Sequence, residues 1–92
     1  MEVKQADNGK EGKFFVEKDG MILARMTYHW NGEDRIVIEH TVVDDVLKGK
    51  GIGKQLVSKA VDFARDRGIK IVPLCTFAIS IFNKVESFRG VL

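Results

Sequence analysis

The chain has 92 residues, of which 45% are hydrophobic and 30% charged, a composition typical of one soluble globular domain and not of a disordered segment. Fifteen basic and 13 acidic residues leave a formal net charge of +2, which is too close to balance to predict a nucleic-acid-binding protein. A single cysteine, Cys75, excludes an intramolecular disulfide, and two separated histidines give no zinc-ligand spacing.

The N-terminal residues 1–12 are mostly polar and lack the apolar core of a signal peptide. No apolar run in the chain approaches the roughly 20 residues that a membrane-spanning helix needs. We therefore expect a cytoplasmic protein without a membrane partner. It should fold as a single domain over residues 1–92, with residues 1–12 loosely ordered.

Three β-strands are predicted in the first half of the chain, at residues 13–18, 21–30 and 35–43. The dipeptide Asp-Gly at 19–20 and Asn-Gly within 31–34 are strong turn signals. The three strands are therefore expected to form an antiparallel meander.

The third of these strands reads RIVIEHTVV, and strict alternation places His40 on a mainly apolar face with Ile36 and Ile38. Glu39 falls on the opposite face. A histidine in this position is either a hydrogen-bonded structural residue or a proton acceptor in catalysis, since imidazole titrates in the useful range.

The second half of the chain has a different pattern. Apolar residues recur at helical spacing over 53–67, and Gly68 is well placed to end that helix. Residues 69–74 predict a fourth strand, in which pairing stops at Pro73 because proline has no amide hydrogen. A second helix is predicted over 76–88. The order strand-strand-strand-helix-strand-helix predicts an α/β (α+β) fold whose mixed sheet contains one right-handed crossover.

Three glycines at alternate positions, Gly49, Gly51 and Gly53, separate the third strand from the first helix. Glycine is a poor residue in regular elements, but it lets the backbone turn sharply and lets a phosphate approach the first amides of a helix. The lysines around these glycines are Lys48, Lys50 and Lys54. The stretch therefore indicates either a cradle for a phosphate or pyrophosphate, or a flexible solvated loop.

Two familiar phosphate-binding motifs do not fit this stretch. The mononucleotide P-loop requires Gly-Lys-Ser/Thr, whereas Gly53 and Lys54 are followed by Gln55. The dinucleotide fingerprint G-x-G-x-x-G requires a glycine where the chain has Lys54. Binding of nucleic acid by the lysine-rich loop is a third interpretation, which the near-neutral charge of the chain supports only weakly.

The stretch KGKGIG, residues 48–53, resembles the acetyl-CoA motif Arg/Gln-x-x-Gly-x-Gly/Ala of the GNAT superfamily of N-acetyltransferases. Gly51 and Gly53 match the two motif glycines, and Lys48 replaces the usual arginine or glutamine. The predicted order of elements is also similar to that family's core. The segments IEHTVV, GKGIGKQLV and VPLC together resemble very short GNAT-like proteins, which lack the N-terminal helical region of full-length relatives.

This resemblance implies that the cofactor is acetyl-CoA. The amides of residues 50–54 would bind its pyrophosphate, and the pantetheine arm would run between the strands 35–43 and 69–74 where they separate. The residues implied in cofactor binding are Thr41, Val42, Val43, Lys48, Gly49, Lys50, Gly51, Ile52, Gly53 and Lys54. Short relatives carry a histidine and a tyrosine where this chain has Val85 and Phe88, so no polar role is expected at those two positions.

Cys75 and His40 are the candidates for catalysis. Cys75 follows the fourth strand and precedes a helix N-terminus, which favours the thiolate. The resemblance implies that this strand end lies near the thioester. Cys75 is then a transient acetyl acceptor, a general acid for the leaving thiolate, or an inert lining residue. Glu39 is a further candidate proton acceptor.

The resemblance implies transfer of an acetyl group from acetyl-CoA to an amine acceptor, either a protein lysine or a small molecule. The alternative is a non-catalytic module that senses acetyl-CoA or docks a protein partner. The second predicted helix carries three phenylalanines, and any part of its apolar stripe that is left exposed would mark a homodimer or partner surface.

Overall fold

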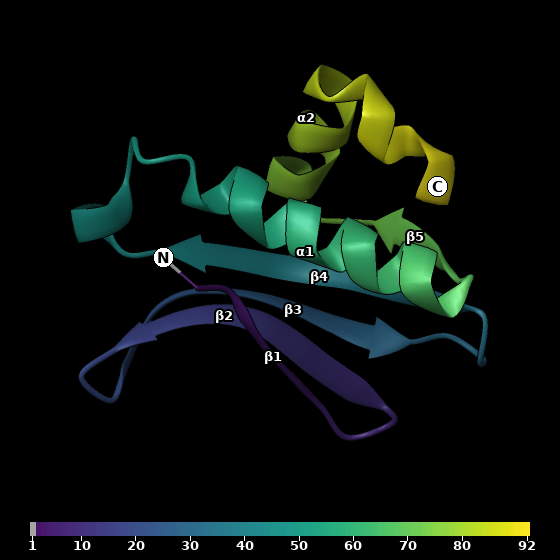
Figure 1. Ribbon diagram of the computed structural model, residues 1–92, viewed down its shortest axis with the longest axis horizontal. Coiled ribbons are helices and arrows are strands. Elements are labelled where there is room, and N and C mark those ends of the chain that lie inside the picture. Colours follow the sequence, from purple (N-terminus) through teal and green to yellow (C-terminus); the bar gives the residue numbers. More distant parts are fainter. Residues whose placement is uncertain (1) are drawn as a thin grey trace.

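The computed structural model describes residues 2–92 as a sheet with two α-helices and two short 3-10 helices, η1 and η2 (Figure 1). The elements in chain order are β1 (Lys4–Asp7), β2 (Glu11–Lys18), β3 (Met21–Trp30), β4 (Arg35–Val43), η1 (Asp45–Leu47), α1 (Ile52–Arg67), β5 (Lys70–Pro73), α2 (Thr76–Lys84) and η2 (Glu86–Val91).

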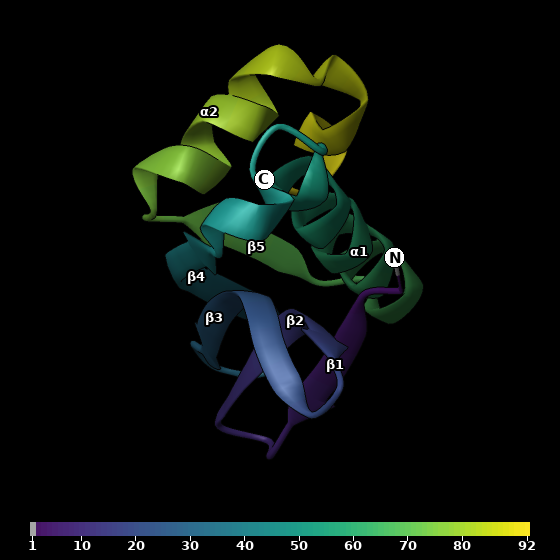
Figure 2. The same cartoon turned by 90° about the vertical axis from the view of Figure 1, so that its left-hand side faces the viewer.

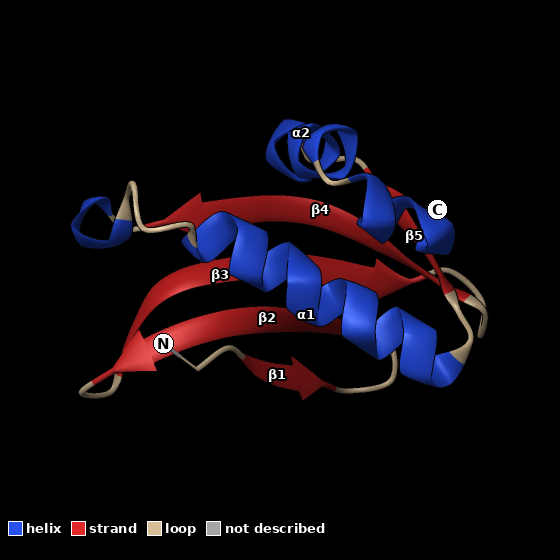
Figure 3. Cartoon of the chain, turned by 45° about the horizontal axis from the view of Figure 1, so that its top comes forward, coloured by secondary structure: helices blue, strands red, loops and turns tan. Residues whose placement is uncertain are grey.

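The five strands form one mixed sheet in the order β1-β2-β3-β4-β5. Strands β1 to β4 pair antiparallel, and β4 pairs parallel with β5 through the α1 crossover. Both α-helices lie on the same side of the sheet (Figure 2), and α1 runs diagonally across the strands (Figure 3). The predicted fold class, with its mixed sheet and single strand-helix-strand unit, is confirmed.

The expectation of loose order over residues 1–12 is wrong for residues 2–12, where β1 and the start of β2 lie, while residue 1 is outside the described residues. β1 pairs along β2 and is joined to β3 by the Asp7 carboxylate. Its Oδ2 accepts hydrogen bonds from Tyr28 Oη (2.5 Å) and Trp30 Nε1 (2.8 Å), while Oδ1 accepts one from the Gly9 amide (2.7 Å). Tyr28 and Trp30 lie 21 and 23 residues away from Asp7 along the chain, so local sequence patterns do not show these two contacts.

Asp7 is expected to make the stability of the protein sensitive to acid. Partial burial raises the pKa of Asp7, but hydrogen bonds from Tyr28, Gly9 and Trp30 outweigh burial, and the net pKa is lowered. The unfolded carboxyl has a pKa of about 3.9. The ionised group therefore stabilises the fold above that pH, and its contribution is lost as pH falls through the lower folded-state pKa.

Asp7→Asn should lower the free energy of unfolding by about 1 kcal/mol at pH 7, since one strong acceptor is lost. The difference from the unmodified protein should shrink as the pH falls below about 3.9 and then through the lowered folded-state pKa of Asp7, because the carboxyl becomes protonated first in the unfolded and then in the folded state. Thermal unfolding at several pH values measures this, with the exposed Asp62→Asn as the matched control. A difference that is constant with pH would contradict the assigned role of the Asp7 charge.

A β-bulge in β4 corrects the predicted facing of its side chains. Thr27 of β3 pairs with His40, but the next residue, Tyr28, pairs with Ile38, so Glu39 is an extra residue in β4. Ile36 is fully buried, whereas His40 is exposed and does not share the apolar face as strict alternation predicted. The bulge instead places Glu39 and His40 along the same cavity.

The C-terminal ends of α1 and α2 are each satisfied by specific hydrogen bonds. α1 stops at Gly68, whose φ of 65° lets its amide donate to the carbonyls of Ala64 and Arg65. α2 stops at Lys84 and does not continue to residue 88 as predicted. The Arg89 guanidinium, in η2, donates to the carbonyls of Phe82 (2.8 Å) and Asn83 (2.5 Å) and so satisfies the end of α2.

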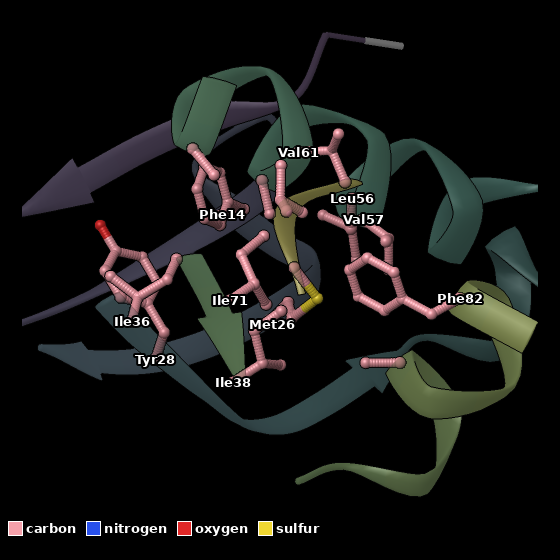
Figure 4. Close-up of a cluster of buried hydrophobic side chains, with 14 of the residues drawn as sticks. Phe14, Met26, Tyr28, Ile36, Ile38, Leu56, Val57, Val61, Ile71 and Phe82 are labelled. Carbon is pink, nitrogen blue, oxygen red and sulfur yellow. The ribbon is translucent and has the colours of Figure 1, made fainter. Parts of the chain in front are cut away.

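The hydrophobic core fills the space between the sheet and the helices (Figure 4). The largest fully buried side chains are Tyr28, Phe14, Met26, Ile36, Ile38, Leu56, Ile71, Val16, Val57 and Val61. They come from β2, β3, β4, β5 and α1, so the core fastens the crossover to the antiparallel strands. Within residues 2–92, no helix combines the length and the apolar character that crossing a membrane requires.

Candidate functional site

The site begins where β4 and β5 separate. Their pairing ends at Ile38 with Pro73, and the last bond across the gap joins the Leu74 amide to the Ile38 carbonyl at 2.9 Å. The predicted end of pairing at Pro73 is confirmed. Beyond it, the edge of β4 that faced β5 carries no ladder partner among the described residues, so the backbone groups of Thr41–Val43 on that edge have no strand partner.

A groove of about 630 Å³ runs beside the separated end of β4 to the start of α1. Its lining residues are Thr41, Val42, Val43, Leu47, Lys48, Gly49, Gly51, Ile52, Gly53, Lys54, Phe77 and Ile81. All the residues predicted to contact a cofactor line this groove except Lys50. The structure therefore gathers the β4 end and the glycine loop into one concave surface.

Gly49 and Gly51 of the loop are required for their backbone conformation. Gly49 and Gly51 have φ values of 78° and 71°, in the left-handed region that side chains disfavour, and both face open space. Gly51 is the residue before α1, and no side chain caps the first amides of that helix. Those amides keep hydrogen-bond donors without a side-chain partner at the end of α1 that borders the groove, a feature that suits an anion.

The lysines of the loop do not contribute equally. Lys48 Nζ lies 2.8 Å from Asp45 Oδ1, and hydrogen bonding to Asp45 raises the pKa of Lys48. The Lys48 charge is thus partly offset before any ligand binds. Lys50 and Lys54 form no ion pair within residues 2–92, so their charges are the ones available to an anion.

Cys75 lies at the start of α2, half-buried, and its Sγ donates to Thr41 Oγ1 at 3.4 Å. Burial raises the pKa of the Cys75 thiol. Hydrogen bonds that the Thr41 hydroxyl and the amides of Ala78 and Phe77 donate to the thiolate form outweigh burial and leave the pKa lowered. A thiol with a lowered pKa at a helix N-terminus is a better nucleophile at neutral pH.

A second cavity, of about 670 Å³, borders Cys75, His40 and Glu39. It shares Thr41 and Val42 with the groove, so Thr41 connects the loop side of the site to the Cys75 side. Glu39 Oε2 lies 3.3 Å from His29 Nδ1 at one side of this cavity. The arrangement places a thiol, an imidazole and a carboxylate around one space, which suits acyl transfer and proton transfer.

Sequence reasoning missed Leu47, Phe77 and Ile81 as lining residues. Phe77 and Ile81 are four residues apart on α2 and therefore lie along one edge of that helix. The unusually wide apolar stripe predicted for this helix was the available signal, because a core-facing stripe alone would have been narrower.

The sequence of this chain matches a known protein family over most of its length. The family model described as GCN5-related N-acetyl-transferase matches residues 13–91. The chain belongs to the GCN5-related N-acetyltransferase family. The match includes β2 to η2, and it therefore covers both the glycine loop and Cys75.

Solved structures and a curated relative agree with this family assignment. A GCN5-like N-acetyltransferase, so described, from Staphylococcus aureus has a TM-score of 0.76 and 36% identity, covering 98% of this chain and 85% of that one. The aminoglycoside N-acetyltransferase AAC(6')-Iy, solved in complex with CoA, shares the fold with a TM-score of 0.64 at 13% identity, covering 90% and 88%.

The Xenopus tropicalis protein NATD1 is 32% identical over 54 residues, which are 59% of this chain. The chain spans about half the length of this curated relative. The shared region marks common ancestry of part of the domain, while the activity of the whole relative does not transfer with it.

Proposed function

We propose that this GCN5-related N-acetyltransferase binds acetyl-CoA in the groove and transfers its acetyl group to an amine. One observation supports this most directly. The uncapped N-terminus of α1, opened by Gly51, faces the same groove as the separated end of β4, which leads by Thr41 to Cys75. Acetyl-CoA has the matching layout, with a pyrophosphate for the α1 end of the groove and a thioester for the Cys75 end.

The residues present fit coenzyme A. The amides at the start of α1, with the Lys54 side chain, would hold the pyrophosphate, since glycines let it approach the backbone. The backbone of Thr41–Val43 would hold the pantetheine arm. A structural neighbour of the same fold was solved with CoA, which supports the choice of ligand.

Acetyl-CoA, when bound, supplies an activated acetyl thioester. The Cys75 thiolate, favoured by its lowered pKa, would attack the thioester carbonyl carbon, and coenzyme A would leave as its thiolate when the carbon–sulfur bond breaks. The amine would then attack the acetyl group on Cys75 and so regenerate the Cys75 thiolate. His40 borders the same cavity and takes the proton that the attacking amine loses. The open cavity beside Cys75 and His40 admits either a small amine or a protein lysine.

The test is a calorimetric titration of the protein with acetyl-CoA, repeated with Gly51→Ala. We expect saturable binding by the unmodified protein and an affinity at least about tenfold weaker in the variant, because φ at residue 51 must change and the anion site with it. Gly20→Ala is the matched control, since Gly20 has a similar φ of 80° and open surroundings in the β2–β3 turn.

Equal loss of affinity in both variants would point to general destabilisation. The absence of binding by the unmodified protein would refute the proposed function. Binding without turnover of any amine would leave a sensor of acetyl-CoA, the non-catalytic alternative.

A further inference from the structure

Gly53 is enclosed by the ring of Phe77. A Cβ atom on Gly53 would lie 1.9 Å from Phe77 Cζ and 2.3 Å from Cε2, closer than any real contact. Gly53 is buried in the first turn of α1 and does not have a positive φ. Its backbone therefore permits any residue that a helix permits, and the ring of Phe77 is what excludes a side chain.

Gly53 differs in this respect from the other loop glycines. A Cβ on Gly49 or Gly51 would meet nothing within 4 Å, and both residues are glycine because of their positive φ. The glycine at 53 thus serves a contact between α1 and α2. That contact closes one side of the groove, which both residues line.

The Phe77 ring is placed to touch a ligand. Its side chain is 38% exposed although it packs on a buried glycine, so one face lies on α1 and another faces the groove. Ile81 continues this apolar surface one turn along α2, and Val43 of β4 lines the same groove. The surface carries no charge, in contrast to the loop end of the groove with Lys48 and Lys54.

We propose that Phe77 contacts the pantetheine arm of coenzyme A and that Gly53 is a positioning residue that sets where the ring lies. The proposal rests on the proposed function, because it assumes that coenzyme A occupies this groove. An apolar ring suits the methyl and methylene groups of the arm, while the phosphates stay at the loop. Gly53 then affects the cofactor through Phe77 in addition to any contact of its own amide.

A double-mutant cycle of Gly53→Ala and Phe77→Ala tests this. Calorimetry measures the affinity of each protein for coenzyme A and for 3′-phospho-ADP, which is coenzyme A without its pantetheine arm. Thermal unfolding of the unmodified protein, the two single variants and the double variant measures how much the Gly53–Phe77 contact contributes to stability without any ligand. Ile79→Ala is the matched control, since Ile79 is also 38% exposed on α2 but does not line the groove.

We expect Phe77→Ala to weaken coenzyme A by about tenfold and to leave 3′-phospho-ADP unchanged. Gly53→Ala should weaken coenzyme A only when Phe77 is present, because the displaced ring causes the loss. Without ligand, Gly53→Ala should lower the unfolding temperature in the unmodified background. It should raise that temperature in the Phe77→Ala background, where alanine's helix preference is the remaining effect.

Other results would overturn the proposal. If Gly53→Ala weakens 3′-phospho-ADP as strongly as coenzyme A, and does so without Phe77, then Gly53 serves the phosphates. If Phe77→Ala leaves coenzyme A affinity unchanged, the ring is not a wall for the arm. If the unmodified protein binds neither ligand, the proposed function fails, and the unfolding temperatures then report on the Gly53–Phe77 contact alone.

Discussion

Cys75→Ala is expected to lower kcat for acetyl transfer by at least about a hundredfold while leaving affinity for acetyl-CoA within about twofold, because a nucleophile is lost and the groove is not. The groove residues do not include Cys75, which borders the second cavity. Intact-mass measurement after mixing with acetyl-CoA should show one added acetyl group in the unmodified protein and none in Cys75→Ala.

A second variant keeps the Cys75 thiol and changes only its pKa. Thr41→Val removes the hydroxyl that lies 3.4 Å from Cys75 Sγ and that helps to lower the pKa of Cys75. The pH profile of thiol alkylation by iodoacetamide should therefore move to higher pH in Thr41→Val, since the thiolate forms later. An unchanged profile would show that the amides at the start of α2 govern the thiol without help from Thr41.

Retention of full activity in Cys75→Ala would assign Cys75 to lining the cavity and would leave direct attack by the amine, with His40 as proton acceptor. Loss of acetyl-CoA affinity together with kcat would indicate that α2 has moved, since Cys75 is the residue before its first turn. Far-ultraviolet circular dichroism and thermal unfolding of the variant separate that outcome from a loss of chemistry.

Phe14→Ala is expected to lower the free energy of unfolding by about 3–5 kcal/mol, the cost of removing a buried aromatic ring. Phe14 is fully buried, and its ring centroid lies 5.2 Å from that of Tyr28 and 6.0 Å from that of Phe63. It joins β2 to β3 and to α1 (Figure 4). A 92-residue domain has little stability to spare, so this variant should be partly unfolded at 37 °C.

The neighbouring residue supplies the matched control. Phe15 lies on the opposite face of β2, half-buried, with the Lys13 ammonium 4.9 Å from its ring centroid. Phe15→Ala should cost no more than about 1–2 kcal/mol, because less area returns to water and no enclosed cavity forms. Urea unfolding of both variants measures the difference. Similar losses of unfolding free energy for the two substitutions would contradict the assignment of Phe14 to the core face of β2 and Phe15 to the opposite face.

Parts of the candidate site could be predicted because they depend on local sequence alone. The glycine loop was predictable because a backbone with positive φ at residues 49 and 51 favours glycine, and the helix that follows has its own apolar periodicity. The end of pairing at Pro73 was visible for the same reason, since a missing amide is a property of one residue. Long-range features leave no such mark.

The β4 bulge is the clearest example of a long-range feature. Whether Glu39 is an extra residue depends on the register of β4 against β3, and that register places Glu39 and His40 along one cavity instead of on opposite faces. The offset of Lys48 by Asp45 and the enclosure of Gly53 by Phe77 likewise depend on how segments meet in space.

The sequence by itself determined the strands β2 to β4, the helix α1, the crossover and the glycine loop, since periodicity, turn residues and glycine conformation are local. Only the tertiary structure decided that β1 joins the sheet through Asp7, that α2 ends at Lys84, and that Cys75 meets Thr41 across 34 residues. Each of these depends on partners distant in the chain, whose positions follow from packing and hydrogen bonding of the whole domain.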